Sequence, residues 1–221
     1  MRALVGCAAT LALGAVLAAG AVAAPAKSPV PESLRDTESL AEDLVDDALS
    51  GDRAGLVEKA AELKSTASGA AAEALKRAAV PRATIAQLER RAAHVAGLAT
   101  RGSFVSVALA ANGVSELMAE LYARFQDPVP PEILTLDYLD REAELRSLAG
   151  QPNAVASAVK QLGPTWAKVR PKVVAAGGAK EAAAYQRHVT AMRRLDPAAA
   201  TKVRAEAERG LALVDELESV F

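Results

Sequence analysis

Short breaks rich in glycine and proline divide this sequence into long stretches of alanine, leucine and valine, and this division is the strongest constraint on its fold. The breaks fall at residues 51–52, 80–81, 101–103, 127–131, 150–152, 175–178 and 196–197. Between them apolar residues recur at three- and four-residue steps, as Leu34, Ala41, Leu44 and Ala48 do. The alternation of β-branched residues that is typical of strands is nearly absent. The sequence therefore predicts an all-α fold, a helical bundle of about eight helical segments.

These segments fall into two similar halves, about residues 32–126 and 132–221, which we expect to form one domain over residues 32–221. The stretch ALSGDRAGLVEKAAEL, residues 48–63, aligns without a gap on SLAGQPNAVASAVKQL, residues 147–162. Farther along, HVAGL at 94–98 aligns on HVTAM at 188–192, so both histidines fall at matching places. This period is much longer than that of the common helical repeats. We interpret the parallel as an internal duplication, although alanine-rich helices align with one another easily.

The first residues have the character of an export signal. Arg2 precedes an uncharged run over residues 3–24, and Ala21-Val22-Ala23 supplies the small-x-small pattern that a signal peptidase recognises. We expect cleavage after Ala23, a proline-rich tether over residues 24–31, and a periplasmic or secreted protein with no membrane span after cleavage. An uncleaved membrane anchor is the alternative, since about 20 apolar residues can cross a bilayer.

Cysteine and charge exclude several classes of function. Cys7 is the only cysteine and leaves with the signal, so the exported chain has no disulfide, no thiolate nucleophile and no iron–sulfur ligands. The chain carries a net charge of −1, and removal of Arg2 leaves −2. This near-neutral balance gives no reason to expect nucleic acid as a partner.

The segment TLDYLDRE, residues 135–142, sets acids, an arginine and a tyrosine among leucines. At about 100° per residue, one apolar stripe contains Leu134, Tyr138, Leu145 and Leu148, and a second contains Leu136, Leu139 and Ala143. A helix that is apolar on two sides packs against more than one neighbour. We therefore expect residues 132–149 to form a central helix.

Four charged residues of this helix are candidates for a site. Asp137, Asp140 and Glu144 gather in an arc between the two stripes, with Arg141 at its margin. Asp137 and Arg141 lie four residues apart and should pair, whereas Asp140 and Glu144 repel each other unless a base or a cation answers them. The arc is either a structural polar seam, which we favour, or a site for a cation or a cationic ligand.

A histidine–methionine pair provides the main alternative. Glu181, Tyr185, His188 and Met192 follow one another at helical spacing on a single stripe. His188 and Met192 could hold haem or a metal ion, with His94 or Met118 supplied by another helix. The same spacing is typical of a packed core seam, which we favour because few aromatic residues are available to enclose a porphyrin. We therefore predict no cofactor and no metal site.

Other signals of enzymatic chemistry are missing. The sequence contains no Glu-x-x-His pair, no HExxH motif and no phosphate-binding glycine loop. The acids at 42–47 have no calcium-type loop and are predicted to be a solvated face. The single tryptophan, Trp166, either fills the core or lines a groove beside Pro164. We predict no catalytic residues and expect a non-enzymatic binding or scaffolding protein of the bacterial cell envelope, with an unidentified protein or small ligand as its partner.

Overall fold

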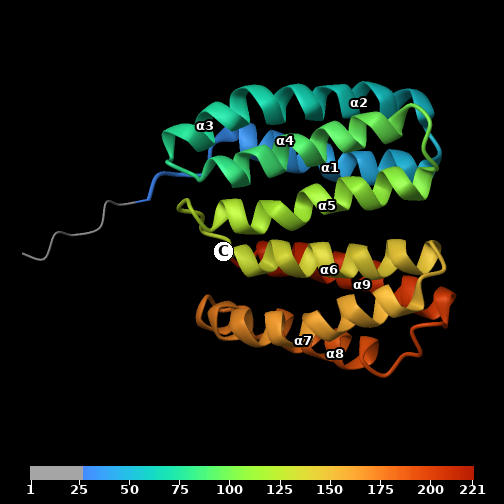
Figure 1. Ribbon diagram of the computed structural model, residues 1–221. Coiled ribbons are helices and arrows are strands. Elements are labelled where there is room, and N and C mark those ends of the chain that lie inside the picture. The colour runs from blue at the N-terminus through green and yellow to red at the C-terminus, as the bar shows by residue number, and fades with distance from the viewer. Residues whose placement is uncertain (1–26) are drawn as a thin grey trace, which may run out of the picture.

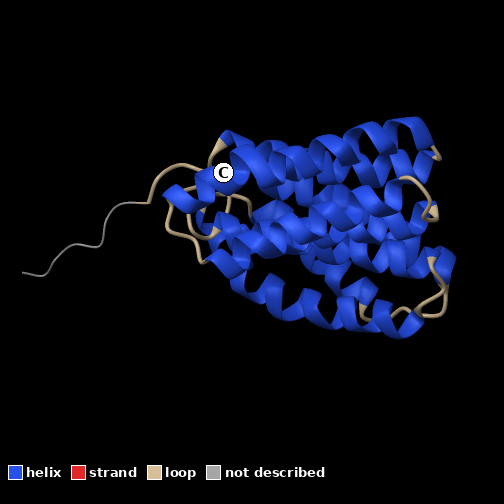
Figure 2. Cartoon of the chain, turned by 45° about the horizontal axis from the view of Figure 1, so that its top comes forward, coloured by secondary structure: helices blue, strands red, loops and turns tan. Residues whose placement is uncertain are grey.

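Eight helical segments run through residues 32–218, and the computed structural model describes residues 27–221 (Figure 1). The predicted signal peptide, Cys7 and residues 24–26 of the predicted tether lie outside the described residues. In the described part of the chain, helices are joined by loops at the two ends of the molecule (Figure 2). The predicted all-α bundle is confirmed.

The first four segments form one closed bundle, which we call the N-terminal bundle. Its helices are α1 (Glu32–Ser50), α2 (Arg53–Thr66), the π-helical turn η1 (Ala67–Ala71), α3 (Ala72–Arg77), α4 (Arg82–Ala99) and α5 (Phe104–Tyr122). The α2, η1 and α3 elements follow one another without a loop and make a single segment. Contacts link α1 to α2, α2 to α4, α4 to α5 and α5 back to α1.

The last four segments repeat this arrangement in the C-terminal bundle. Its helices are α6 (Pro131–Leu148), α7 (Pro152–Ala175), α8 (Ala179–Met192) and α9 (Ala200–Glu218). Contacts link α6 to α7, α7 to α8, α8 to α9 and α9 back to α6. Both bundles therefore have an up-and-down order in which each helix touches the helices before and after it.

Local signals in the sequence explain several helix ends. Gly51 follows α1 with φ of 79°, in the left-handed region that glycine adopts at a helix C-terminus. Asp52 then caps α2, because its side chain accepts hydrogen bonds from the backbone amides of Ala54 and Gly55 at 3.1 and 3.0 Å. Both ends lie where the sequence predicts them.

Each bundle has its own hydrophobic core, and the two bundles meet along α5 and α6. In Figure 1, α5 and α6 lie side by side in the middle of the molecule, and α9 lies behind α6; α1 packs against α5. Leu145 of α6 belongs to the N-terminal core, whereas Leu136 and Leu139 belong to the C-terminal core. As expected from its two apolar stripes, α6 is a central helix.

Among the described helices, α5 alone has the length and apolar composition that would allow it to cross a membrane. Its contacts with α1, α4 and α6 give it a central position. A buried helix of a bundle has the same composition, because it is apolar around most of its circumference.

Residues 27–31, within the predicted tether, pack against the C-terminal end of α5 and the residues that follow it. The Gln126 amide donates to the Ser28 carbonyl at 2.8 Å, and Lys27 donates to the Ala123 carbonyl at 2.7 Å. Val30 is buried in the N-terminal core. These contacts fix the approach of the chain to α1.

Candidate functional site

The four charged residues of α6 lie in different environments, and only Asp137 and Arg141 pair with each other within the helix. Arg141 donates to Asp137 at 3.3 Å, as the four-residue spacing predicts, and both side chains are largely buried. Asp140 and Glu144 do not share a partner. Asp140 faces the C-terminal core, and Glu144 faces the side of α6 toward α9.

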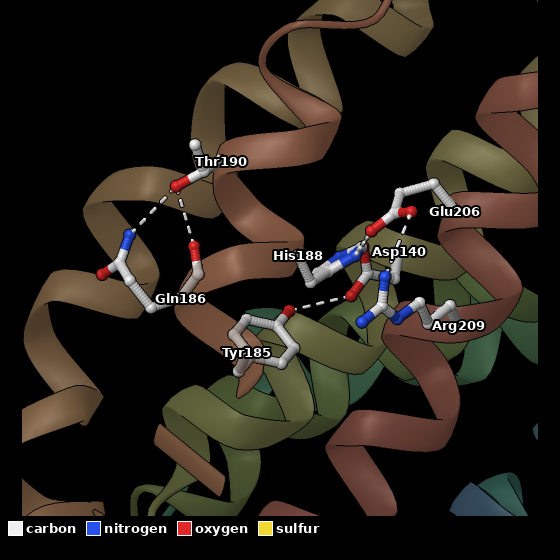
Figure 3. Close-up of polar contacts among 7 residues, drawn as sticks. All are labelled: Asp140, Tyr185, Gln186, His188, Thr190, Glu206 and Arg209. Atoms are coloured by element: carbon white, nitrogen blue, oxygen red, sulfur yellow. Dashed lines mark hydrogen bonds and ion pairs between the residues drawn. The ribbon is translucent and has the colours of Figure 1, made fainter. Parts of the chain in front are cut away.

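Asp140 is answered by two side chains from α8. His188 Nε2 lies 2.9 Å from Asp140 Oδ1, and the Tyr185 hydroxyl donates to Asp140 Oδ2 at 2.8 Å (Figure 3). All three side chains are fully buried. His188 belongs to the stripe of α8 that the sequence offers as a haem or metal ligand set, but here it pairs with Asp140.

His188 is held on its other side by α9. Its Nδ1 lies 3.0 Å from Glu206 Oε1, so both ring nitrogens face carboxylate oxygens. An imidazole can donate from both nitrogens only when it is protonated. Burial opposes the charged ring, but the hydrogen bonds and charges of Asp140 and Glu206 outweigh it and raise the pKa of His188. We call Asp140, Tyr185, His188 and Glu206 the buried network.

A glycine makes room for this network. Gly210 lies on α9 opposite Asp140 and His188, and a Cβ atom there would lie 2.5 Å from Asp140 Oδ2 and 2.6 Å from His188 Nε2. Such distances are far shorter than any side-chain contact, so only glycine allows α9 to approach so closely. Glycine costs a helix interior about 1 kcal/mol relative to alanine.

Trp166 completes the wall of the network. Its ring centroid lies 4.9 Å from that of Tyr185, and its indole N–H donates to the Gln186 side chain at 2.9 Å. Only 2% of Trp166 is exposed, so the tryptophan fills the core, which is one of the two alternatives that the sequence offers. It also forms part of the floor of a surface pocket.

Glu144 lies apart from the buried network. It is 7% exposed, and the charges that act on it most strongly are those of Glu208, Arg141 and Arg204. Burial, with the charge of Glu208, raises the pKa of Glu144 against the opposing effect of the two arginines. The charges of two arginines therefore act on this carboxyl, although among the described residues neither forms an ion pair with it within 4.0 Å.

The residues proposed as cofactor ligands are not brought together. His188 has both nitrogens occupied, Met192 packs in the C-terminal core, Met118 packs in the N-terminal core, and His94 is exposed on α4. Within residues 27–221, no three acidic, histidine or cysteine side chains are grouped so that they could hold a metal ion. Both ring nitrogens of His188 thus face carboxylates, and Met118 and His94 lie in the other bundle.

A pocket that sequence reasoning missed lies where the two bundles meet. It has a volume of about 200 Å³ and draws its walls from α1, the end of α5, the 127–129 linker, α6 and α9. We call it the acidic pocket, because Glu38, Glu42, Asp127 and Glu218 line it, whereas Arg35 is its one lining base. Arg35 pairs with Asp127 at 2.5 Å, and Tyr122 donates its hydroxyl to Glu38.

The carboxyl groups of this pocket are held partly away from water and close to one another. Burial, with the charge of Asp137, raises the pKa of Glu42 to about 8 and that of Glu218 to about 7. Burial likewise raises the pKa of Glu38, against the hydrogen bond from Tyr122. The acidic face predicted to be solvated is therefore divided: Asp43 and Asp46 are exposed, but Glu42 turns toward the other bundle.

One signal in the sequence could have identified part of this pocket. Glu38 and Glu42 lie four residues apart on α1, beside the apolar positions Leu34, Ala41 and Val45. Acids at the edge of an apolar stripe border the neighbouring helices. The contribution of Glu218, which comes from the last helix, depends on how the bundles meet.

Comparison with protein-family models, with curated proteins and with solved structures finds no match to this chain.

Proposed function

We propose that this chain is a non-enzymatic binding protein of the bacterial cell envelope, and that the acidic pocket holds a small organic cation. Export is supported by the apolar run over residues 3–24 and by the Ala21-Val22-Ala23 pattern. The single observation that carries the choice of ligand is a pocket with an excess of carboxyl groups and an aromatic wall.

The charge of the pocket favours a cation. Three carboxyl groups with raised pKa values surround one volume, and their raised pKa values reflect burial and mutual repulsion. A positive charge placed among them would relieve the repulsion and stabilise their ionised forms. The ring of Tyr122 adds a second attraction, because the faces of aromatic rings attract ammonium and guanidinium groups. Arg35 already lies over this ring, 5.8 Å from its centroid.

An organic ammonium fits better than a metal ion. Divalent cations require several oxygen ligands at about 2.0–2.6 Å, held in a compact shell. The described acids include no such group. An amine can instead accept carboxylates spread around a larger volume, because each N–H bond points at a separate acceptor.

A binding role also agrees with the state of the buried network. Its acid, base and hydroxyl groups satisfy one another, and none of them lines the acidic pocket or the pocket beside Trp166. A catalytic acid or base must come within hydrogen-bond reach of its substrate. We therefore assign the network a structural role and place ligand recognition at the acidic pocket.

The test is calorimetry of the purified protein with putrescine, a small diamine, at pH 7. We expect saturable binding that releases protons, because Glu42 and Glu218 are partly protonated at this pH and lose protons to the bound cation. Proton release is measured by repeating the titration in buffers with different ionisation enthalpies. The Glu42→Gln, Glu218→Gln double variant should bind at least about tenfold more weakly, which corresponds to about 1.4 kcal/mol.

The matched control is Glu216→Gln, an exposed acid on the same helix as Glu218. It should leave the affinity unchanged. The proposal fails if putrescine does not bind at millimolar concentration, or if it binds the double variant as tightly as the parent. Tighter binding of Mg²⁺ or Ca²⁺ than of the diamine would replace it with a metal site, and a Soret band or bound transition metal in the purified protein would support the haem or metal alternative.

A further inference from the structure

A second binding feature lies on the outer side of the C-terminal bundle, between α7 and α8. Two adjoining pockets, of about 310 and 560 Å³, follow the same face of α7 and share Lys160 and Arg193. We call them together the α7–α8 groove. In Figure 1, α7 and α8 are the helices farthest from the N-terminal bundle, so the groove is separate from the acidic pocket.

The sequence of α7 explains why this groove is open. The face that α7 turns to it carries Ala156, Gly163 and Ala167, whose side chains are too small to cover the gap to α8. The floor is apolar and consists of Val155, Val159, Trp166, Val189, Met192 and Val203. The indole N–H of Trp166 already donates to Gln186, so it needs no hydrogen-bond acceptor from a ligand.

The rim of the groove is basic. Lys160, Arg170 and Arg193 line it and are exposed, and no acidic residue lines either pocket. None of the three forms an ion pair within 4.0 Å in the part of the chain that the structure describes. Arg193 reaches over α7, since a Cβ atom on Gly163 would lie 3.9 Å from its Nη1.

We infer that the α7–α8 groove binds a single amphiphilic anion, with an apolar chain along the floor and an anionic head group between Lys160 and Arg193. The apolar floor supplies the favourable burial of a hydrocarbon chain, at about 0.8 kcal/mol per buried methylene. The rim supplies two cations at the junction of the pockets, where one head group can meet both.

The dimensions of the groove favour a small molecule over a protein partner. Its pockets fall near the range of about 300–1,000 Å³ that small-molecule sites occupy. A docked helix would instead need a row of pockets for anchors at i, i+3, i+4 and i+7. A free amphiphile also fits better than a membrane surface, because the apolar floor is recessed between two helices.

Trp166 makes the inference directly testable, because it is the only tryptophan and lies on the floor. The probe is decanoate with a bromine at the end of its chain, which quenches indole fluorescence on contact. We expect saturable quenching of the purified full chain. The Lys160→Gln, Arg193→Gln double variant should weaken binding at least tenfold, and Ala167→Phe, which fills the groove from an exposed position, should abolish it.

Lys168→Gln is the matched control, since Lys168 is exposed on α7 but does not line the groove. It should bind as the parent does, and decyltrimethylammonium should bind at least tenfold more weakly than decanoate. Equal binding of the two amphiphiles, or unchanged binding by the double variant, would overturn the inference. Two other results would also overturn it if decanoate gives no quenching. One is flotation on phosphatidylglycerol vesicles that depends on Lys160 and Arg193, and the other is capture of an acidic amphipathic peptide.

Discussion

The two bundles bury equivalent positions of their helices, yet they fill one layer of their cores with different chemistry. A shift of 99 residues carries the buried positions Leu34, Thr37, Ala41, Leu44, Val45 and Ala48 of α1 onto Ile133, Leu136, Asp140, Ala143, Glu144 and Ser147 of α6, all of them buried. A shift of 96 carries Val107, Ala111, Val114, Met118 and Leu121 of α5 onto Val203, Ala207, Gly210, Val214 and Leu217 of α9. The shared register follows from the common order of the helices.

The difference is concentrated around the buried network. Three positions of the N-terminal bundle are equivalent to members of this layer: Ala41 corresponds to Asp140, Leu88 to Tyr185 and Val114 to Gly210. The first set is apolar and close-packed, whereas the second set is hydrogen-bonded and depends on a glycine. One topology therefore accommodates either kind of layer.

The comparison indicates what the buried network contributes. A buried ion pair is weak support for stability, because the desolvation of its charges offsets most of their attraction. Its hydrogen bonds are directional, however, and Asp140 meets His188 and Tyr185 in only one alignment of α6 and α8. We expect the network to fix the register of the C-terminal bundle, whereas side-chain shape alone fixes that of the N-terminal bundle.

The largest expected effect follows from Asp140→Ala, which introduces the residue found at the equivalent position 41. His188 would keep a buried charge with one partner, and the Tyr185 hydroxyl would lose its acceptor. Removing one member of a buried ionic network typically costs about 3–5 kcal/mol. Urea unfolding at pH 7 should show a loss of that size.

Converting the whole layer should recover much of this loss. The variant that combines Asp140→Ala with Tyr185→Leu, His188→Leu and Gly210→Val has an apolar layer like that of Ala41, Leu88 and Val114 in the other bundle, where Arg91 holds the position equivalent to His188. We expect it to regain at least half of the lost free energy of unfolding, because the fully buried polar groups are removed together and the partly exposed Glu206 keeps Arg209 at 3.9 Å. A loss below about 1 kcal/mol for Asp140→Ala alone would mean that the network does not hold the bundle together.

A smaller effect is expected from Gly210→Val, which introduces the side chain found at position 114. The new Cβ would collide with Asp140 and His188, so α9 must move away from α6 and α8. We expect a loss of about 2–3 kcal/mol, in the range typical of overpacked cores. Thermal unfolding followed by circular dichroism measures it, as a fall in Tm of several degrees.

Gly97→Ala provides the control for glycine replacement itself. Gly97 lies in α4 of the other bundle with open space around its Cβ position. Alanine there should raise stability by up to about 1 kcal/mol through helix propensity. If both variants shift Tm in the same direction, the close approach at Gly210 is not the constraint that the distances imply.

The helices and their caps could be predicted from the sequence, because they depend on neighbours within a few residues. The breaks at Gly51 and the cap at Asp52 are of this kind. The pairing of Asp137 with Arg141 also follows from local spacing. Of the alternative cofactor ligands, His188 and Met192 share α8, whereas Met118 and His94 belong to helices of the other bundle.

The partners of buried charges could not be predicted, because they depend on the packing of distant helices. His188 meets Asp140 across 48 positions of sequence, and a glycine on a third helix permits the contact. The alignment of His94 with His188 was misleading. Burial matches α4 with α8 at a shift of 97, which leaves His94 exposed and opposite Ala191.

The smallest expected effect concerns the acidic pocket, where the two bundles meet. The shift of 99 matches Glu42 of α1 with Arg141 of α6, so the two helices carry opposite charges at equivalent positions. The folded-state pKa of Glu42, about 8, lies above its unfolded value near 4.5. The folded protein therefore binds this proton more tightly, and the resulting stability, fully present below pH 4.5, is lost as the pH rises to 8.

Glu42→Gln removes this loss. We expect the variant to unfold like the parent near pH 4.5, and to be more stable by about 1 kcal/mol at pH 8.5, after allowance for partial screening by solvent. In a protein of this size the difference corresponds to about 2–4 °C in Tm. Glu58→Gln, which changes an exposed acid on α2, is the matched control. A stability difference that is constant from pH 4.5 to 8.5 would mean that Glu42 acts through packing. It would contradict the presence of a protonated Glu42 carboxyl in the acidic pocket.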